Sequence, residues 1–352
     1  MGVNSKFWKG RSVFLTGHTG FKGGWLALWL TKMGANVYGY SFEAPTNPSF
    51  FNVINLETKI QNSTKGDIRN LSELKNSIQE ARPSVIFHMA AQPLVRQSYN
   101  DPIETFTTNI IGTINVFEAA KKVETVEAIV NVTTDKCYEN QESDRPYQET
   151  DRLGGYDPYS SSKACSEIIT SAYRNSFLSA NGIKLASVRA GNVIGGGDWA
   201  TDRLIPDFFR SIDNDKILSV RSLQAVRPWQ HVLDPLSGYL MLAEKLVIND
   251  DNFAEAWNFG PEQSDAKTVF WVLDRLSEKF SNAKWQEETI NQPHEANMLK
   301  LDISKAKLKL GWTPQWSLET AIDNTIKWYQ AFKKNENMTE FSIKQIKAYQ
   351  SS

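Results

Sequence analysis

Two short segments carry side chains that could move protons. Tyr159-Ser-Ser-Ser-Lys163 places a phenol and an ammonium group four residues apart, and Thr134, Asp135 and Lys136 bring a hydroxyl, a carboxyl and an amine together. Residues four apart share one face of a helix. A free phenol has a pKa of about 10, and a neighbouring cation stabilises its phenolate form. Tyr159 could therefore take a proton from a substrate hydroxyl, with Thr134 donating a hydrogen bond to the developing alkoxide.

The Tyr-x-x-x-Lys spacing alone proves little, because it recurs at Tyr329 and Lys333. Position separates the two instances. Tyr159 follows Pro158 at the start of a predicted helix, after a predicted strand that ends at Thr133, and open α/β sheets bind their ligands at the carboxyl ends of strands. Tyr329 lies in a C-terminal helix rich in apolar and basic residues. The alternative interpretation of residues 134–136 is that they are simply polar residues at the end of a strand, without a chemical role.

A glycine-rich segment follows the first predicted strand, Ser12–Thr16. Gly17, Gly20 and Gly23 stand at three-residue intervals, directly before the apolar helical run 25–30. Glycines let the backbone approach a pyrophosphate, whose charge is met by free N–H groups at the helix start. A tight turn with helix-packing glycines is the alternative. The position between strand and helix favours dinucleotide binding.

The region that usually binds the ribose of a dinucleotide is ambiguous. An acidic residue is expected about 20 residues after the glycine loop, where Ser41 occupies the usual place and Glu43 comes slightly later. This position does not settle NAD against NADP. Asp67, before a predicted helix, could accept a hydrogen bond from an adenine amino group or cap the helix N-terminus.

Short apolar strands alternate with amphipathic segments over the first 190 residues. Such alternation is typical of βαβ units, and strands almost free of charge indicate a sheet covered by helices on both faces. We therefore expect an α/β fold with a doubly wound parallel sheet. The predicted strands are 12–16, 36–40, 84–89, 128–133 and 184–189, and the predicted helices are 21–32, 70–80, 102–121 and 160–179.

After Arg189 the composition of the sequence changes, beginning with the glycine-rich segment 191–199. We expect residues 1–190 to form a dinucleotide-binding domain that carries the catalytic residues and residues 191–352 to form mainly a substrate lobe, with some segments returning to the first domain. Helices are predicted at 234–247, 268–280 and 318–334. The polar residues from Asn335 onward are expected to fray.

The composition of the chain argues against several classes of function. The 39 basic and 40 acidic residues give a net charge of -1, so no basic field exists to bind nucleic acid or an anionic membrane. The 2 cysteines suit a reducing compartment, and no signal peptide or membrane span is predicted, so we expect a cytoplasmic protein. The 4 histidines, including His294, lack metal-ligand spacing, and no metal is expected.

The order of these motifs resembles the extended short-chain dehydrogenase/reductase family: the glycine loop, His88-Met-Ala-Ala91, Tyr159-x-x-x-Lys163 and Arg189-Ala-Gly-Asn192. The resemblance spans essentially the whole chain. It implies a Rossmann-type sheet with a smaller mixed α/β C-terminal lobe and bound NAD. The implied cofactor-binding residues are Gly17, His18, Thr19, Gly20, Phe21, Lys22, Gly23, Asp67, Ile68, Ala90, Ala91, Gln92, Asn109, Tyr159 and Lys163.

Within this family, four longer segments are most similar to the 4,6-dehydratases of CDP-linked sugars: 16–25, 91–96, 134–138 and 195–199. The resemblance implies NAD-mediated oxidation of CDP-glucose at C4, elimination of water across C5–C6 and hydride return to C6. It assigns Asp135 as the acid at C6 and Lys136 as the base at C5, where sister enzymes acting on dTDP-glucose have glutamate. If Lys136 stays charged, it would instead stabilise the enolate. The alternatives are a nucleotide-sugar 4-epimerase and a non-catalytic NAD(P)-binding protein.

A nucleotide-sugar diphosphate brings about two negative charges, so this nearly neutral chain needs dedicated cations to bind it. Trp199 could stack on the pyrimidine or simply pack in the core. The resemblance also implies a homodimer or homotetramer formed through the helices at 102–121 and 160–179. The expected substrate-binding residues are Arg96, Asn192, Trp199, Arg203, Leu204, Arg221 and Arg227.

Overall fold

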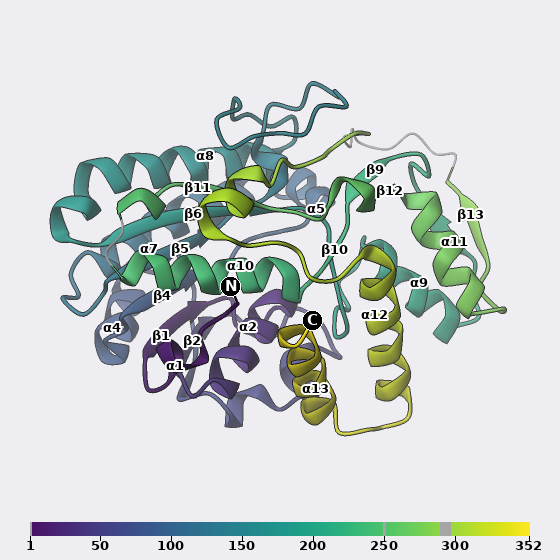
Figure 1. Ribbon diagram of the computed structural model, residues 1–352, viewed down its shortest axis with the longest axis horizontal. Helices are drawn as coiled ribbons and strands as arrows, with labels where there is room; N and C mark the ends of the chain where they lie inside the picture. Colours follow the sequence, from purple (N-terminus) through teal and green to yellow (C-terminus); the bar gives the residue numbers. More distant parts are fainter. Residues whose placement is uncertain (1, 249–250, 289–296) are drawn as a thin grey trace.

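A parallel sheet forms the centre of the protein in the computed structural model, which describes residues 2–248, 251–288 and 297–352 (Figure 1). The sheet has 7 strands in the order β11-β6-β5-β4-β1-β2-β3, and every neighbouring pair is parallel. The predicted doubly wound α/β fold is confirmed. The strands are β1 Ser12–Thr16, β2 Asn36–Ser41, β3 Asn62–Lys65, β4 Val85–His88, β5 Ala128–Val132, β6 Lys184–Ala190 and β11 Ala256–Phe259.

Alternating strand residues face two separate cores, as the pleat of a strand requires. On one face, Val13 and Leu15 of β1 pack in a cluster with α2 (Phe21–Lys32) and α10 (Leu233–Val247). On the other face, Phe14 packs with α4 (Leu71–Ala81) and α7 (Gly112–Ala120). Both faces are apolar because both are covered by helices.

The helices predicted in the first half are confirmed with small changes at their ends. The segment predicted at 102–121 is a nearly continuous run of α6 (Pro102–Phe106), a turn of π-helix η2 (Thr107–Ile111) and α7 (Gly112–Ala120). The segment predicted at 160–179 is α8 (Pro158–Tyr173), which continues into the π-helical turn η4 (Arg174–Leu178). The remaining helices before β6 are α1 Ser5–Trp8, α3 Phe50–Val53, α4 Leu71–Ala81 and α5 Val95–Asn100.

The second half contributes both to the central sheet and to a smaller core. α10 packs on β5 and β6, and β11 pairs with β6. The smaller core gathers side chains of α9, α11 and α12. The division expected at residue 190 stays a prediction. The further elements are α9 Leu204–Asp213, α11 Val269–Lys279, α12 Leu318–Lys333 and the short strands β7 Val193–Ile194, β8 Leu218–Val220, β9 Val226–Pro228, β10 Gln230–His231, β12 Ala266–Thr268 and β13 Trp285–Glu287.

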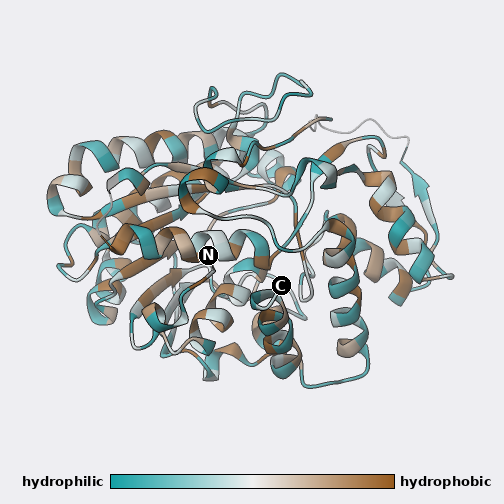
Figure 2. Ribbon diagram, viewed as in Figure 1, coloured by the Kyte–Doolittle hydropathy of each residue, from teal (hydrophilic) through white to brown (hydrophobic). Residues whose placement is uncertain are grey.

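The C-terminal end corrects a prediction. Residues from Asn335 onward were expected to fray, but Met338–Gln350 form helix α13, capped by the side chain of Asn337. Met338, Ile346 and Tyr349 are buried against the core of α2 and α10, and α13 shows both apolar and polar surfaces in Figure 2. These apolar residues recur at helical spacing, a signal that the many polar residues between them masked. Within the described part of the chain, no helix is long and apolar enough to cross a membrane.

Candidate active site

A cavity of about 770 Å³ opens at the carboxyl ends of the central strands and extends between the sheet and α9. This volume is within the range of small-molecule sites. Its walls come from both halves of the chain. The predicted site residues that line it are Gly17, Thr19, Gly20, Phe21, Lys22, Gly23, Ile68, Ala90, Ala91, Gln92, Thr134, Asp135, Lys136, Tyr159, Lys163, Asn192, Trp199, Arg203, Leu204, Arg221 and Arg227.

The glycine loop is shaped to receive a phosphate. Gly17 has φ +79°, and a Cβ on it would stand 2.7 Å from the backbone nitrogen of Ala90, while a Cβ on Gly23 would stand 2.1 Å from the carbonyl oxygen of Gly17. Side chains at these positions are therefore excluded. Gly20 is the N-cap of α2, and no side chain caps this helix. The open N–H groups of the first turn fit an anionic pyrophosphate.

At the predicted ribose-binding position, the two candidate side chains lie in different environments. Glu43 is exposed and pairs with Lys65, whereas Ser41 is buried and its hydroxyl lies 2.8 Å from that of Thr19. Asp67 does not cap α4, because Asn70 does so by accepting a hydrogen bond from the backbone of residue 73. The carboxylate of Asp67 pairs instead with Arg69. The helix-cap alternative for Asp67 is therefore wrong.

Two residues expected at the cofactor have side chains engaged elsewhere. The ring of His18 is buried beneath Gly39, and its Nε2 lies 2.8 Å from the hydroxyl of Ser63. Burial lowers the pKa of His18 to about 4, so the ring is neutral. Asn109 is buried; its amide accepts a hydrogen bond from the backbone of Gln92 and donates one to Ser162. His18 and Asn109 thus support the loops that line the cavity.

Tyr159 and Lys163 lie on the first two turns of α8, which Asp157 caps by accepting a hydrogen bond from the backbone of residue 160. Burial raises the pKa of Tyr159 to about 12, although a hydrogen bond with Thr134 and the charge of Arg203 act in the opposite direction. Burial also lowers the pKa of Lys163 to about 8. Its ammonium donates to the carbonyl oxygen of Val132 at 3.2 Å. The phenol therefore needs added positive charge to act as a base near neutral pH.

The residues after β5 form a short 3₁₀ turn, η3 (Asp135–Cys137), which directs them into the same cavity. The hydroxyl of Thr134 donates to a carboxyl oxygen of Asp135 at 3.0 Å, and Thr134 lies close enough to Tyr159 to act against the rise in the pKa of the phenol. Burial raises the pKa of Asp135 against the opposing charges of Lys136 and Arg227. A carboxyl group with a raised pKa is better suited to act as an acid than an ordinary aspartate.

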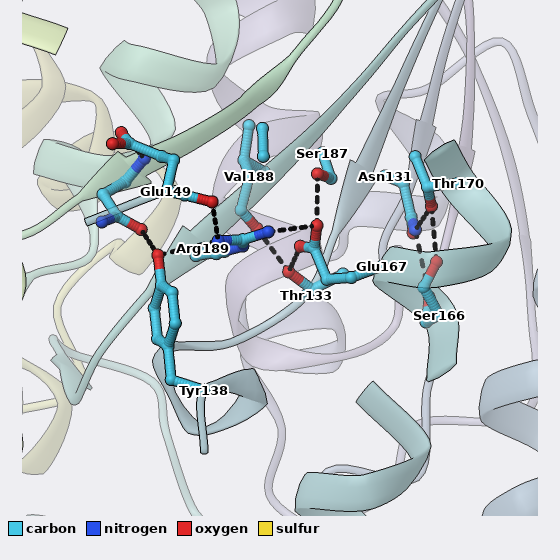
Figure 3. Close-up of polar contacts among 12 residues, drawn as sticks. Asn131, Thr133, Tyr138, Glu149, Ser166, Glu167, Thr170, Ser187, Val188 and Arg189 are labelled. Carbon is cyan, nitrogen blue, oxygen red and sulfur yellow. Dashed lines mark hydrogen bonds and ion pairs between the residues drawn. The ribbon is translucent and has the colours of Figure 1, made fainter. Parts of the chain in front are cut away.

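A buried polar network connects this turn to the sheet and to α8 (Figure 3). Arg189 of β6 pairs with Glu167 of α8 at 2.8 Å and donates to the hydroxyl of Tyr138, next to η3. Glu167 also accepts hydrogen bonds from Thr133 and Ser187. Neither Glu167 nor Tyr138 was predicted as a site residue from the sequence. The feature of the sequence that could have revealed this network is the charged residue Glu167, four residues after Lys163 on an otherwise buried helix face.

The predicted substrate-binding residues Arg203, Arg221 and Arg227 line the part of the cavity beside α9. Arg203 is the N-cap residue of this helix, which no side chain caps, and its guanidinium pairs with Asp198 at 2.8 Å. Arg227 is buried and lies close enough to Asp135 to influence its pKa. Arg96 does not line the cavity, but its guanidinium pairs at 3.2 Å with Asp202, which does. The helix terminus and these arginines suit a diphosphate.

Trp199 lines the cavity but also packs in the core. Its ring makes edge contacts with Trp328 and Phe332 at centroid distances of 5.7 and 5.1 Å. The same segment contains Asp198, which sequence analysis did not assign and which orients Arg203.

The second Tyr-x-x-x-Lys instance lies away from this site. The hydroxyl of Tyr329 bonds Asp213, and Lys333 pairs with the same carboxylate at 2.9 Å. Among the described residues, no cluster of side chains could hold a metal ion, and His294 lies outside them.

Comparisons with known proteins agree with this architecture. The chain is 50% identical over 356 residues to a CDP-glucose 4,6-dehydratase of Salmonella typhimurium, covering 99% of each chain. It is 26% identical to a dTDP-glucose 4,6-dehydratase of Haemophilus influenzae, covering 75% of this chain and 81% of that protein.

Among solved structures, a UDP-glucose 4-epimerase of Thermotoga maritima with UDP-glucose has a TM-score of 0.79 at 23% identity, covering 91% of this chain and 99% of that one. A dTDP-glucose 4,6-dehydratase of Bacillus anthracis in complex with NAD has a TM-score of 0.75 at 23% identity, covering 94% and 99%.

The model of the GDP-mannose 4,6 dehydratase family matches residues 14–325, which include the glycine loop, the η3 turn and the start of α8. The agreement between this match, the full-length relative and the parallel sheet shows that the chain belongs to the GDP-mannose 4,6 dehydratase family.

Proposed function

We propose that the protein dehydrates CDP-D-glucose to CDP-4-keto-6-deoxy-D-glucose with bound NAD. The observation that carries this proposal is that Thr134, Asp135 and Tyr159 line one cavity, where Thr134 donates a hydrogen bond to the carboxyl group of Asp135. A base for oxidation and an acid for elimination therefore share one cavity. The similarity to the Salmonella typhimurium CDP-glucose 4,6-dehydratase over the whole chain supports CDP as the nucleotide.

The glycine loop and the first turn of α2 would hold the pyrophosphate of NAD, and residues 90–92 after β4 would line its path toward Tyr159. When bound, NAD supplies reversible hydride transfer. The start of α9, with Arg203, Arg221 and Arg227, would hold the diphosphate of the sugar nucleotide.

During oxidation, the phenolate oxygen of Tyr159 removes the proton of the C4 hydroxyl. Lys163 stabilises the phenolate electrostatically, and Thr134 donates a hydrogen bond to the developing oxyanion. During elimination, Asp135 gives its proton to the departing C6 hydroxyl, which leaves as water, and Lys136 removes the proton from C5, which the 4-keto group has made acidic. The hydride taken from C4 would then return to C6 of the 5,6-ene while C5 takes a proton back from Lys136, which gives the 6-deoxy product with no net NADH. The burial that raises the pKa of Asp135 supports its role as the acid.

The test is to incubate the protein and NAD separately with CDP-, dTDP-, UDP- and GDP-glucose, followed by mass spectrometry of each sugar nucleotide. We expect loss of one water molecule from CDP-glucose without net NADH. Tyr159→Phe should abolish the reaction, while Tyr329→Phe, in the second Tyr-x-x-x-Lys pattern, should retain it. Unchanged mass with an inverted sugar carbon would instead show an epimerase, and no reaction with any substrate would contradict an enzymatic role.

We also propose that the protein forms at least a homodimer through the surface of α6, η2 and α8. Three large apolar side chains of these elements are exposed: Ile103 by 76%, Ile111 by 46% and Ile168 by 57%. Apolar residues grouped on neighbouring helices favour association. Sedimentation of wild type and Ile168→Glu should give a dimer or larger assembly and a smaller species, respectively. A monomeric wild type would contradict the proposal.

A further inference from the structure

The three consecutive glycines Gly195, Gly196 and Gly197 belong to the segment that leads from β7 to α9 along the wall of the cavity. Gly195 and Gly197 line the cavity, whereas Gly196 packs on the indole of Trp328, where a Cβ would stand 2.0 Å from the ring. This close packing excludes a side chain at Gly196, and glycine has more backbone freedom than any other residue. Contacts from other elements must therefore hold the segment in one position.

Trp25 holds this segment from the side of the glycine loop. It is a fully buried residue of α2, two residues after Gly23. Its indole N–H donates a hydrogen bond to the carbonyl oxygen of Gly196 at 2.9 Å. Its ring stacks on Phe50 at a centroid distance of 4.7 Å, and Phe50 also packs against Gly197, where a Cβ would stand 2.4 Å from the ring. One directed hydrogen bond and aromatic packing therefore hold the glycine segment.

Asp198 connects the glycine segment to Arg203. Its side chain is 7% exposed and pairs with the guanidinium of Arg203 at 2.8 Å, and it also accepts a hydrogen bond from the backbone of Ala200 at 3.0 Å. Arg203 begins α9 and lines the cavity. The position of this guanidinium therefore depends on the backbone before Asp198, to which Trp25 is bonded.

We propose that Trp25 is a positioning residue for the substrate, because its hydrogen bond to Gly196 holds Arg203 where it binds the diphosphate of the sugar nucleotide. The inference rests on the function proposed above. Without the indole N–H, the buried carbonyl oxygen of Gly196 loses this donor, and the glycine segment can adopt other conformations. An arginine that is in place for only part of the time binds the diphosphate more weakly in proportion. The effect concerns binding rather than chemistry, since Trp25 is not among the described residues that line the cavity.

The test measures CDP binding by calorimetry in the full chain saturated with NAD, for wild type, Trp25→Phe and Trp29→Phe. CDP carries the diphosphate and does not react. Trp29 is the matched control, because it lies on the same helix and is equally buried, while its indole nitrogen has no hydrogen-bond partner within the described part of the chain. Trp25→Phe should weaken CDP binding by roughly three- to tenfold, the size of one net hydrogen bond, and raise KM for CDP-glucose with kcat nearly unchanged. Trp29→Phe should keep the wild-type affinity.

Arg203→Met supplies a readout that a merely structural role would not move. If Trp25 acts through Arg203, adding Trp25→Phe to Arg203→Met should cause little further loss of CDP affinity, whereas independent effects would multiply. Asp198→Asn, which removes the ion pair with Arg203, should weaken CDP binding in the same way. It also tests the inference if Trp25→Phe does not fold, which thermal unfolding of each variant shows.

Wild-type affinity for CDP in Trp25→Phe or in Asp198→Asn would overturn the inference. An equal loss in Trp29→Phe would also overturn it, and so would effects of Trp25→Phe and Arg203→Met that multiply in full. A wild type that binds CDP but does not dehydrate CDP-glucose would contradict the proposed function alone. A wild type that does not bind CDP would contradict both.

Discussion

Replacing Arg189 by methionine tests how strongly the buried network in Figure 3 stabilises the fold around η3. The Arg189 and Glu167 side chains are 3% and 2% exposed, and their charged groups lie 2.8 Å apart. Without Arg189, the buried carboxylate retains hydrogen bonds from Thr133 and Ser187 but no opposite charge. Removing one partner of a buried pair costs about 3–5 kcal/mol. We expect Arg189→Met to lower the free energy of unfolding by this amount.

The direction in which stability changes with pH follows from the pKa of Glu167. Burial alone would raise its pKa, but Arg189 holds the pKa of Glu167 below its ordinary value. The pair therefore contributes stability above the ordinary glutamate pKa of about 4.3, and this contribution is lost as pH falls through the folded pKa. In Arg189→Met, burial prevails and raises the pKa of Glu167. The deficit of the variant should then shrink as pH falls, because Glu167 takes up a proton.

Urea unfolding followed by tryptophan fluorescence at pH 7 and at about pH 5 measures both effects. Glu167→Gln combined with Arg189→Met should recover part of the loss, since neither charge is then buried alone. Arg275→Met, which removes an exposed ion pair with Glu278, should cost less than about 1 kcal/mol. The reasoning is refuted if Arg189→Met costs no more than this control, or if the double variant is no more stable than Arg189→Met.

Three further predictions concern the cavity and the C-terminal helix. Gly23→Ala should weaken NAD binding, measured by calorimetry, because the new Cβ would stand 2.1 Å from the carbonyl oxygen of Gly17; unchanged affinity would contradict the phosphate loop. Asp135→Asn should lower kcat for dehydration by about 10²–10⁴-fold without weakening CDP-glucose binding, because it removes only the acid; a kinetic assay with a parallel binding measurement checks this. Asp234 of α10 accepts a hydrogen bond from the hydroxyl of Tyr349 on α13, and burial raises the pKa of Asp234 to about 7. Stability should therefore fall as pH rises from the ordinary aspartate pKa of about 4 to about 7 and then level off, and Asp234→Asn should remove this dependence in thermal unfolding.

The central strands of the sheet could be predicted from the sequence better than the strands at its edges. β1, β4 and β5 are short, apolar and almost fully buried, so their composition alone distinguishes them from helices and loops. β3 has the sequence Asn-Ser-Thr-Lys and lies at the edge of the sheet. It pairs through its backbone without an apolar face, and no hydrophobic pattern could reveal it. β11 was missed because its place beside β6 depends on a crossover between distant segments.

The same distinction applies to the candidate site. Groups that come from one strand end, such as Thr134 and Asp135, were found because chain order already places them together. Trp25 was not found, since it lies in an apolar helix and reaches the backbone of Gly196 only in the folded chain. Arg189 and Glu167 meet across β6 and α8 in the same way. Spacing within one segment is visible in a sequence, but contacts between segments require the fold.

Burial favours the neutral form of the titratable groups in the cavity. It raises the pKa of Tyr159 and Asp135 and lowers the pKa of Lys22 and Lys163, so each group is shifted toward its neutral form. Two anionic diphosphates, one from each proposed ligand, would favour protonated lysines. More positive charge beside Tyr159 would in turn favour its phenolate. Ligand binding would therefore activate the base, which ties proton removal from the sugar to an assembled ternary complex.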